Sequence, residues 1–200
     1  MINFPLLIYT QQIKSRNLLI YYPYVSGQQS GPIQRINSRI QQEVQKQISS
    51  QNYDGGIKTE MTGFFEIKTN ERNVLSLTLE NYAFSGGAHG LTILKGLTFD
   101  ANTGKSYRLK DLFKDGSDYV KRLSDIISKQ IIERDIFVLD PPFKGIAPNQ
   151  DFYIADKSLI IFFQLYELTA YVYGFPYFPI SVYEIQEIVK EDGPLGIMIG

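Results

Sequence analysis

Residues 57–99 constrain the fold more than any other part of this sequence. Apolar residues alternate with polar or charged ones along residues 57–68, and the same two-residue period returns in residues 74–84. A third run, residues 91–99, is again mostly apolar. A two-residue period places successive side chains on opposite faces of a strand, so that one face of each strand is buried. Three such segments with short links predict an antiparallel β-meander.

The link between the last two of these strands is the most unusual segment of the chain. Residues 85–90 read Ser-Gly-Gly-Ala-His-Gly and hold the single histidine of the 200 residues. Glycines gather where the backbone needs positive φ angles or where a ligand approaches the main chain closely. The sequence therefore predicts a tight loop that presents a titratable side chain. His89 has three open interpretations: a residue that fixes the loop, part of a binding surface, or a catalytic group.

Two helices are expected to cover the sheet. From Ile33 to Ile48 the apolar residues recur in steps of three and four, which places them on one face of a helix. A second helix is expected after residues 116–118, with apolar residues between Tyr119 and Ile131 facing inward. An apolar stripe of this kind indicates packing on a sheet more often than the binding of a partner.

Further strands flank these elements. Residues 5–25 and 152–166 each read as a hairpin, and residues 159–163 are apolar on both faces, as in a central strand. Residues 177–181 read as a last strand, and residues 183–189 as a short helical segment. Between the second helix and the second hairpin, a proline-rich stretch reads as a long irregular loop.

The predicted fold class is α+β, with an antiparallel sheet of meander and hairpins and two main helices packed on it. We expect a single domain over residues 1–200, because its length and its 44% hydrophobic content suit one core. The order of elements also suggests two loosely similar halves, about residues 1–95 and 96–200, that share one sheet.

The composition excludes several function classes. The net charge is −1 and only 20% of residues are charged, so no nucleic-acid partner is expected. The absence of cysteine excludes disulfides, thiolate catalysis and cysteine-based zinc sites.

No segment reaches the roughly 18 apolar residues that a membrane-spanning helix needs. The first eight residues lack the basic start of a signal peptide. Two locations are therefore compatible with the sequence. The protein is cytoplasmic, or a signal or anchor precedes this sequence.

Similarities to known chemical motifs are incomplete. Residues 103–106 resemble the end of a phosphate-binding loop, but Phe99 stands where that motif needs its first glycine. Residues 100–111 match part of a calcium-binding loop, but Lys105 replaces the required glycine. One histidine gives little support to a triad with Ser85 or to a metal centre. We therefore expect no catalytic residue, no metal and no cofactor.

A hydrolase that uses paired acidic side chains is the alternative. Asp151, Asp156 and Glu167 are the acids that such a pair would draw on. The competing interpretation makes them solvated loop acids, with Glu167 in a structural hydrogen bond.

Several short motifs, taken in order, resemble a known family. They are residues 85–90, 97–105, 109–113, 152–154, 166–174 and 178–180. Together they resemble the extracytoplasmic domain of RsiV-type anti-sigma factors, which also precedes the catalytic part of PdaC-type peptidoglycan deacetylases. The resemblance extends from about Ile33 to Val189. It implies an α+β domain that is not itself catalytic and acts outside the cytoplasmic membrane, and in the RsiV type it implies a lysozyme-sensing role.

The expected function is therefore a non-enzymatic extracytoplasmic domain that binds or senses a lysozyme-like protein or a cell-wall glycan. The third alternative is an accessory module of a larger envelope protein, and the oligomeric state is open. Aromatic side chains beside a rigid glycine loop suit recognition, because tyrosine adds contact area at low entropic cost. We expect the two motif-bearing loops to lie on a common face. The predicted ligand-binding residues are Ser85, Gly86, Gly87, His89, Tyr171, Tyr173 and Phe175.

Overall fold

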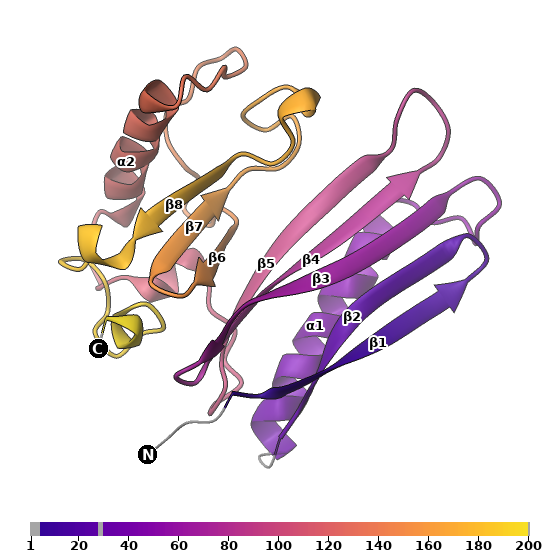
Figure 1. Ribbon diagram of the computed structural model, residues 1–200, viewed down its shortest axis with the longest axis horizontal. Coiled ribbons are helices and arrows are strands. Elements are labelled where there is room, and N and C mark those ends of the chain that lie inside the picture. The colour runs from indigo at the N-terminus through magenta and orange to yellow at the C-terminus, as the bar shows by residue number, and fades with distance from the viewer. Residues whose placement is uncertain (1–4, 28–29, 200) are drawn as a thin grey trace. The chain divides into compact units, whose positions relative to one another are not determined.

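The computed structural model describes residues 5–27 and 30–199. Within them the chain forms two α-helices and two separate sheets, of five and three strands (Figure 1). The α+β class and the mostly antiparallel pairing are thus confirmed. The chain divides into two compact units, Met1–Ser106 and Tyr107–Gly200. Among the described residues, no helix is both long enough and apolar enough to cross a membrane.

The first unit, called unit 1 below, holds the larger sheet. Its elements are β1 (Leu7–Ser15), β2 (Leu18–Ser26), α1 (Ser30–Ser50), β3 (Glu60–Glu71), β4 (Val74–Phe84) and β5 (Leu91–Asp100). The strands lie in chain order, and every neighbouring pair is antiparallel except β2 and β3. Those two are parallel because α1 carries the chain back between them, as a parallel connection requires. The predicted hairpin, helix and meander are confirmed.

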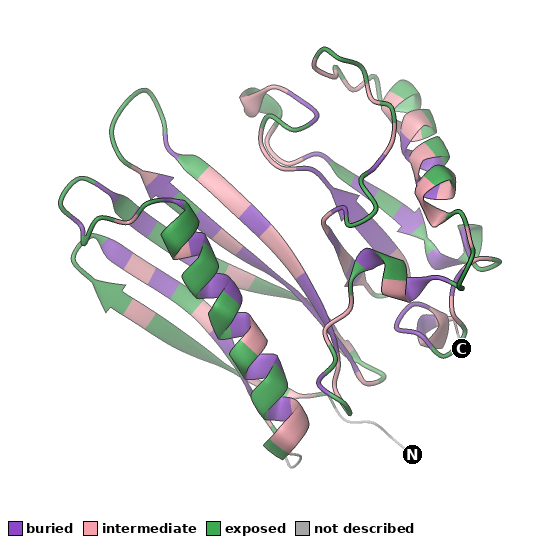
Figure 2. Ribbon diagram, turned by 180° about the vertical axis from the view of Figure 1, so that it is seen from behind, coloured by how far each residue is buried: buried purple, intermediate pink, exposed green. Residues whose placement is uncertain are grey.

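One face of this sheet is covered by α1 (Figure 2). Its buried stripe, Ile33, Ile36, Ile40 and Val44, packs in one cluster with the leucines of β4. Asn37 lies in the same stripe, and its amide accepts from the backbone N–H of Val25 at 2.8 Å and donates to the Val25 carbonyl at 2.9 Å. A buried amide paired on both sides stabilises this contact between helix and strand.

The alternation in β3 does not predict burial at either end of that strand. A register shift lies between Ile67 and Thr69. Ile67, which the alternation places on the buried face, is 37% exposed beside this irregularity, whereas Thr69 is buried. Ile57, which the pattern places on the buried face, precedes β3 and is 71% exposed.

The second unit, called unit 2 below, holds the smaller sheet. Its main elements are α2 (Tyr119–Glu133), β6 (Phe152–Ala155), β7 (Ser158–Phe162) and β8 (Tyr177–Ser181), with short 3₁₀ turns η1 (Leu109–Leu112), η2 (Tyr171–Tyr173), η3 (Val182–Glu184) and η4 (Gly196–Met198). β7 lies between β6 and β8, and residues 159–163 are all buried. The predicted central strand is thus confirmed. Residues 183–189 are not the expected helical segment, because only the single turn η3 forms there.

The two halves do not share one sheet, as the order of elements had suggested. After β5 the chain turns back, and Phe99 and Ser106 form an isolated bridge. Within residues 5–27 and 30–199, no further strand extends the five-stranded sheet. The division into units follows Ser106, because residues 91–100 stay in the sheet of unit 1 as β5.

Candidate functional site

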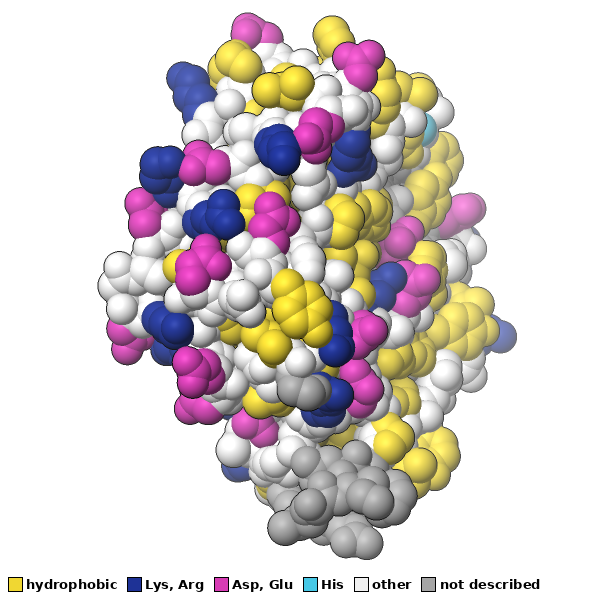
Figure 3. Space-filling model, turned by 60° about the vertical axis from the view of Figure 1, so that its left-hand side comes forward, with side chains coloured by type: hydrophobic (Ala, Val, Ile, Leu, Met, Phe, Trp, Pro, Cys, Tyr) yellow, Lys and Arg dark blue, Asp and Glu magenta, His cyan; other side chains and the backbone are white. Residues whose placement is uncertain are grey.

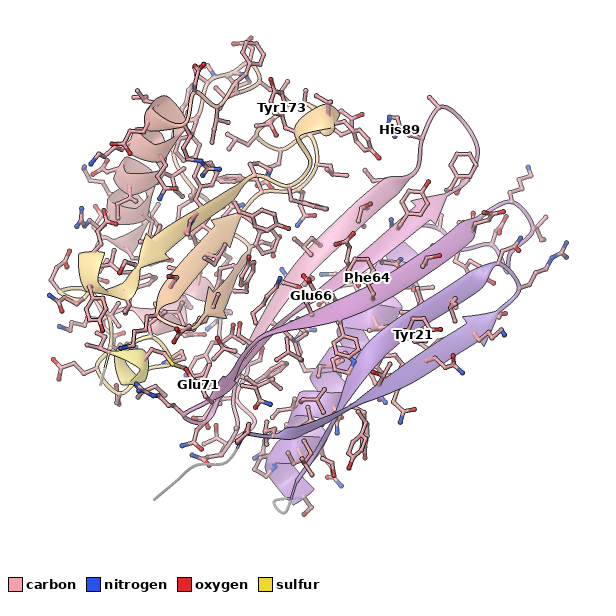
Figure 4. The ribbon with its side chains drawn as sticks, in the orientation of Figure 1. Tyr21, Phe64, Glu66, Glu71, His89 and Tyr173 are labelled. Atoms are coloured by element: carbon pink, nitrogen blue, oxygen red, sulfur yellow. The ribbon has the colours of Figure 1, made fainter. Side chains whose placement is uncertain are left out.

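A pocket of about 320 Å³ lies in unit 1, between the C-terminal end of α1 and the loop from β4 to β5. Figure 4 shows His89 on this loop, beyond the ends of the two strands. Of the described residues that line the pocket, none carries a permanent charge. They are Ser50, Gln51, Asn52, Ala83, Ser85, Gly86, His89, Gly90, Leu91 and Ile93.

The glycines of this loop are needed for two different reasons. Gly86 and Gly87 have φ angles of +93° and +102°, and a β-carbon at either position would meet no atom within 4 Å. Their role is conformational, because L-residues rarely adopt such angles. A β-carbon at Gly90 would lie 2.4 Å from the ring of Tyr82 and 2.5 Å from the Ala83 carbonyl oxygen. Gly90 therefore provides space for that ring.

Ser85 joins the loop to the turn that precedes β3. Its hydroxyl lies 2.9 Å from the Thr59 hydroxyl. The Thr59 backbone N–H donates to the Asp54 carboxylate, which also accepts from the N–H groups of Ile57 and Lys58. The small burial of Asp54 acts to raise the pKa of this carboxyl, but these backbone donors outweigh it and hold the pKa below its ordinary value. The turn thus carries a stable negative charge and supports Ser85 through Thr59.

Gln51 fixes the other wall of the pocket. Its side-chain N–H donates to the Leu91 carbonyl at 2.7 Å, and its carbonyl accepts from the Asn81 amide at 2.6 Å. Nδ1 of His89 lies 2.9 Å from the Gly90 carbonyl. A neutral ring that donates from Nδ1 carries its acceptor at Nε2. The arrangement offers amide, hydroxyl and imidazole groups beside the apolar side chains of Ala83, Leu91 and Ile93. Such a lining suits an uncharged ligand with both polar and apolar parts.

Three of the predicted ligand-binding residues, Ser85, Gly86 and His89, line this pocket, whereas the sequence did not point to its helical side. Ser50 is the last residue of α1, and Gln51 and Asn52 form the turn that follows it. Asn52 has a φ of +56°, the left-handed conformation that asparagine tolerates after a helix. That signal marks the end of the helix, but it does not reveal which loop lies against it.

Gly87 lies in the same loop of unit 1 but does not line the pocket, and the other three predicted ligand-binding residues lie in unit 2. Tyr171 and Tyr173 form η2, which Gly174 ends with a φ of +68°. Tyr173 is 56% exposed, whereas Phe175 is half-buried. The rings of Tyr166 and Tyr171 are 5.6 Å apart. A common face for the two predicted loops stays a prediction, because they belong to different units.

The acidic side chains considered for a hydrolase have structural partners. Glu167 accepts from the backbone N–H of Gln164 at 2.6 Å and from the Gln150 amide at 3.0 Å. Asp151 accepts from the Gln164 side chain at 3.0 Å. Asp156 lies between β6 and β7 with a φ of +51°. The expected structural hydrogen bond of Glu167 is confirmed. Over the described residues, no group of three or more His, Asp or Glu side chains is placed to hold a metal ion.

Two family models match the two units separately. Residues 12–92, within unit 1, match a family model described as deacetylase PdaC. Residues 110–183, within unit 2, match one described as protein of unknown function DUF3298. A curated relative, the peptidoglycan-N-acetylmuramic acid deacetylase PdaC of Bacillus subtilis (strain 168), is 24% identical over 186 residues. The match covers 89% of this chain but only 40% of that relative.

Solved structures of the DUF3298 family share the fold of both units. A member from Bacteroides fragilis NCTC 9343 has a TM-score of 0.67 at 13% identity, covering 96% of this chain and 97% of that one. A member from Pseudomonas aeruginosa PAO1 has a TM-score of 0.65 at 14% identity, covering 95% of each chain.

Proposed function

We propose that this chain, a domain of the PdaC-like and DUF3298 family, is a non-catalytic binding domain of the cell envelope that recognises N-acetylated glycan in the pocket of unit 1. The relative in Bacillus subtilis is named for peptidoglycan, a polymer that lies outside the cytoplasmic membrane. An extracytoplasmic location follows from the same proposal.

The neutral, two-sided lining of the pocket is the observation that carries this proposal. An acetamido group has a methyl group that suits the side chains of Leu91 and Ile93, and an amide that suits Asn52, Ser85 or His89. A volume of about 320 Å³ is near the lower limit for small-molecule sites, and it fits one sugar unit better than a long segment of polymer. A charged ligand would lack a partner among these side chains.

The tyrosine turn of unit 2 is proposed as a separate contact. Tyr173 is exposed on η2, and an exposed aromatic ring can stack on a sugar or anchor a protein. A lysozyme-like protein remains the alternative ligand for this turn.

The proposed absence of catalysis is supported by the bonding of the acids. Glu167 and Asp151 each accept hydrogen bonds that hold the segment around Gln164. Hydrogen bonds of this kind, to the amide and backbone groups of neighbouring segments, are typical of acids with a structural role.

Calorimetric titration with an N-acetylglucosamine tetramer tests the pocket. We expect His89→Ala combined with Asn52→Gly to weaken binding at least about 10-fold, a loss of about 1.4 kcal/mol. Glycine at position 52 keeps the backbone conformation, and Gln41→Ala, on the exposed side of α1, is the control. Binding unchanged in the double variant would eliminate the pocket as the site.

Two further measurements separate the alternatives. Binding of lysozyme that is lost in Tyr173→Ala, without binding of the tetramer, would favour the protein ligand. Chromatography of the tetramer after long incubation should show no shorter products. Cleavage that disappears in Glu167→Gln would establish the hydrolase instead.

A further inference from the structure

The sheet of unit 1 has a second face, opposite α1, that carries exposed aromatic rings. Tyr21 on β2, Phe64 on β3 and Tyr82 on β4 are 39%, 46% and 39% exposed. Their neighbours in sequence, such as Ile20, Phe65 and Ala83, belong to the core beneath α1. Because side chains alternate along a strand, these three rings point the other way. Figure 4 shows Tyr21 and Phe64 on the side toward the viewer, with α1 behind the sheet.

The strand register places these rings close to one another. Ile20 pairs with Gly63, so Tyr21 and Phe64 occupy adjacent positions one residue further along the parallel strands. Tyr82 pairs with Thr62, two residues from Phe64 on the same face of the sheet. Three neighbouring strands span about 10 Å, which is wide enough for a flat platform of rings. We call Tyr21, Phe64 and Tyr82 the aromatic platform.

Two carboxylates lie next to Phe64 on the same face of the sheet. Glu80 is half-buried and pairs directly with Phe64 across the strands. Glu66 follows Phe64 by two residues, and its carboxylate lies 2.6 Å from the Lys68 ammonium. Burial raises the pKa of Glu80, the nearby Glu66 carboxylate raises it further, and Lys68 opposes both. These two carboxylates and one ammonium leave an excess of negative charge beside Phe64, and Glu60 and Lys14 on the same face add one charge of each sign.

This combination defines the chemistry of a ligand. Figure 3 shows hydrophobic side chains gathered on the side of the molecule that carries the histidine, with acidic and basic groups among them. Rings favour a ligand with flat apolar faces, and the carboxylates favour a cation. A peptide that lies on the face of a sheet cannot form main-chain hydrogen bonds with a strand edge. A sugar ring can stack on the face while its hydroxyl groups keep their hydrogen bonds to water, so the surface suits a sugar better than a peptide.

We propose that the aromatic platform binds a glycan with free amino groups, whose sugar rings stack on Tyr21, Phe64 and Tyr82 while an ammonium group contacts Glu80 and Glu66. This second site goes beyond the pocket, which has no charged lining and takes the N-acetylated form. One unit would then contact both acetylated and deacetylated sugars through separate surfaces.

Titration with a glucosamine tetramer in mildly acidic buffer, where most of its amines are protonated, tests the platform. Glu80→Gln keeps the shape of the side chain and removes its charge, so we expect binding at least about 10-fold weaker. Phe64→Ala is expected to weaken binding by a similar factor through lost stacking. Glu71→Gln, at the far end of β3, is the matched control and should bind like the unmodified chain.

The N-acetylglucosamine tetramer separates this proposal from the pocket. Its binding should not change in Glu80→Gln, whatever its affinity for the pocket. Thermal melting of each variant identifies any that fails to fold, and Tyr21→Ser then replaces Phe64→Ala as the test of stacking. The proposal is overturned if Glu80→Gln binds the glucosamine tetramer as tightly as the unmodified chain. It is also overturned if a lysine-rich peptide binds as tightly and with the same losses, because the surface would then select charge alone.

Discussion

The same residue type serves different physical purposes at different positions of this protein. Gly86 and Gly90 lie four positions apart in one loop, yet only Gly86 has a positive φ and only Gly90 is crowded by Tyr82 and Ala83. Glycines of the same loop therefore need not be equally replaceable. The difference is visible only once the neighbours in space are known.

Gly90→Ala should destabilise the protein by about 1–3 kcal/mol, the usual cost of inserting a carbon into a filled space. The Ala83 carbonyl belongs to β4 and cannot move without disturbing the strand. Urea unfolding followed by circular dichroism measures the change. Gly31→Ala is the control, since Gly31 has no positive φ and the nearest atom that a β-carbon there would meet is 3.8 Å away. A Gly90→Ala variant with the midpoint of the unmodified chain would show that Tyr82 moves aside freely.

At the scale of elements, a short turn connects α1 to β3 and also supports the loop of the pocket. Asp54 accepts three backbone N–H groups, and Thr59 at the end of the turn contacts Ser85. Because the donors lower the pKa of Asp54 on folding, its carboxylate stabilises the folded state. That contribution is complete above 3.8, the ordinary pKa of an aspartate, and is lost as the pH falls through the lower folded value.

Asp54→Asn should therefore lower the urea midpoint at neutral pH, and the difference from the unmodified chain should shrink as the pH falls below 3.8. Unfolding curves at several pH values measure it. Asp192→Asn changes an exposed aspartate near the C-terminus and provides the baseline. A constant difference between Asp54→Asn and the unmodified chain at all pH values would mean that the ionised form contributes nothing.

The whole molecule consists of two compact units, and a different family model matches each of them. Unit 1 has a five-stranded sheet, a covering helix and a continuous core that joins α1 to β2, β3, β4 and β5. A unit with its own core contains what a domain needs to fold alone.

A fragment of residues 1–106 should fold without the rest of the chain. Circular dichroism and amide NMR spectra should show native structure, and urea should unfold the fragment in one cooperative step. If residues 1–200 form a single domain, as expected from the sequence, the fragment should instead be unfolded. A disordered fragment would support that expectation and contradict ours.

Local patterns in the chain were enough to predict most of the helices and strands, the glycine–histidine loop and the α+β class. A hydrophobic period of two residues, or of three to four, involves only a few neighbouring positions. The effects of a proline or a glycine are equally local, so these features can be predicted from the sequence alone. The pocket was only half predicted, because Gln51 meets Leu91 across 40 positions of sequence. The alternation fails at Ile67, which is exposed next to the register shift in β3, and the turn after β5 separates the two sheets along the chain. Such features arise from contacts between distant segments, whose packing energies no short stretch of sequence contains.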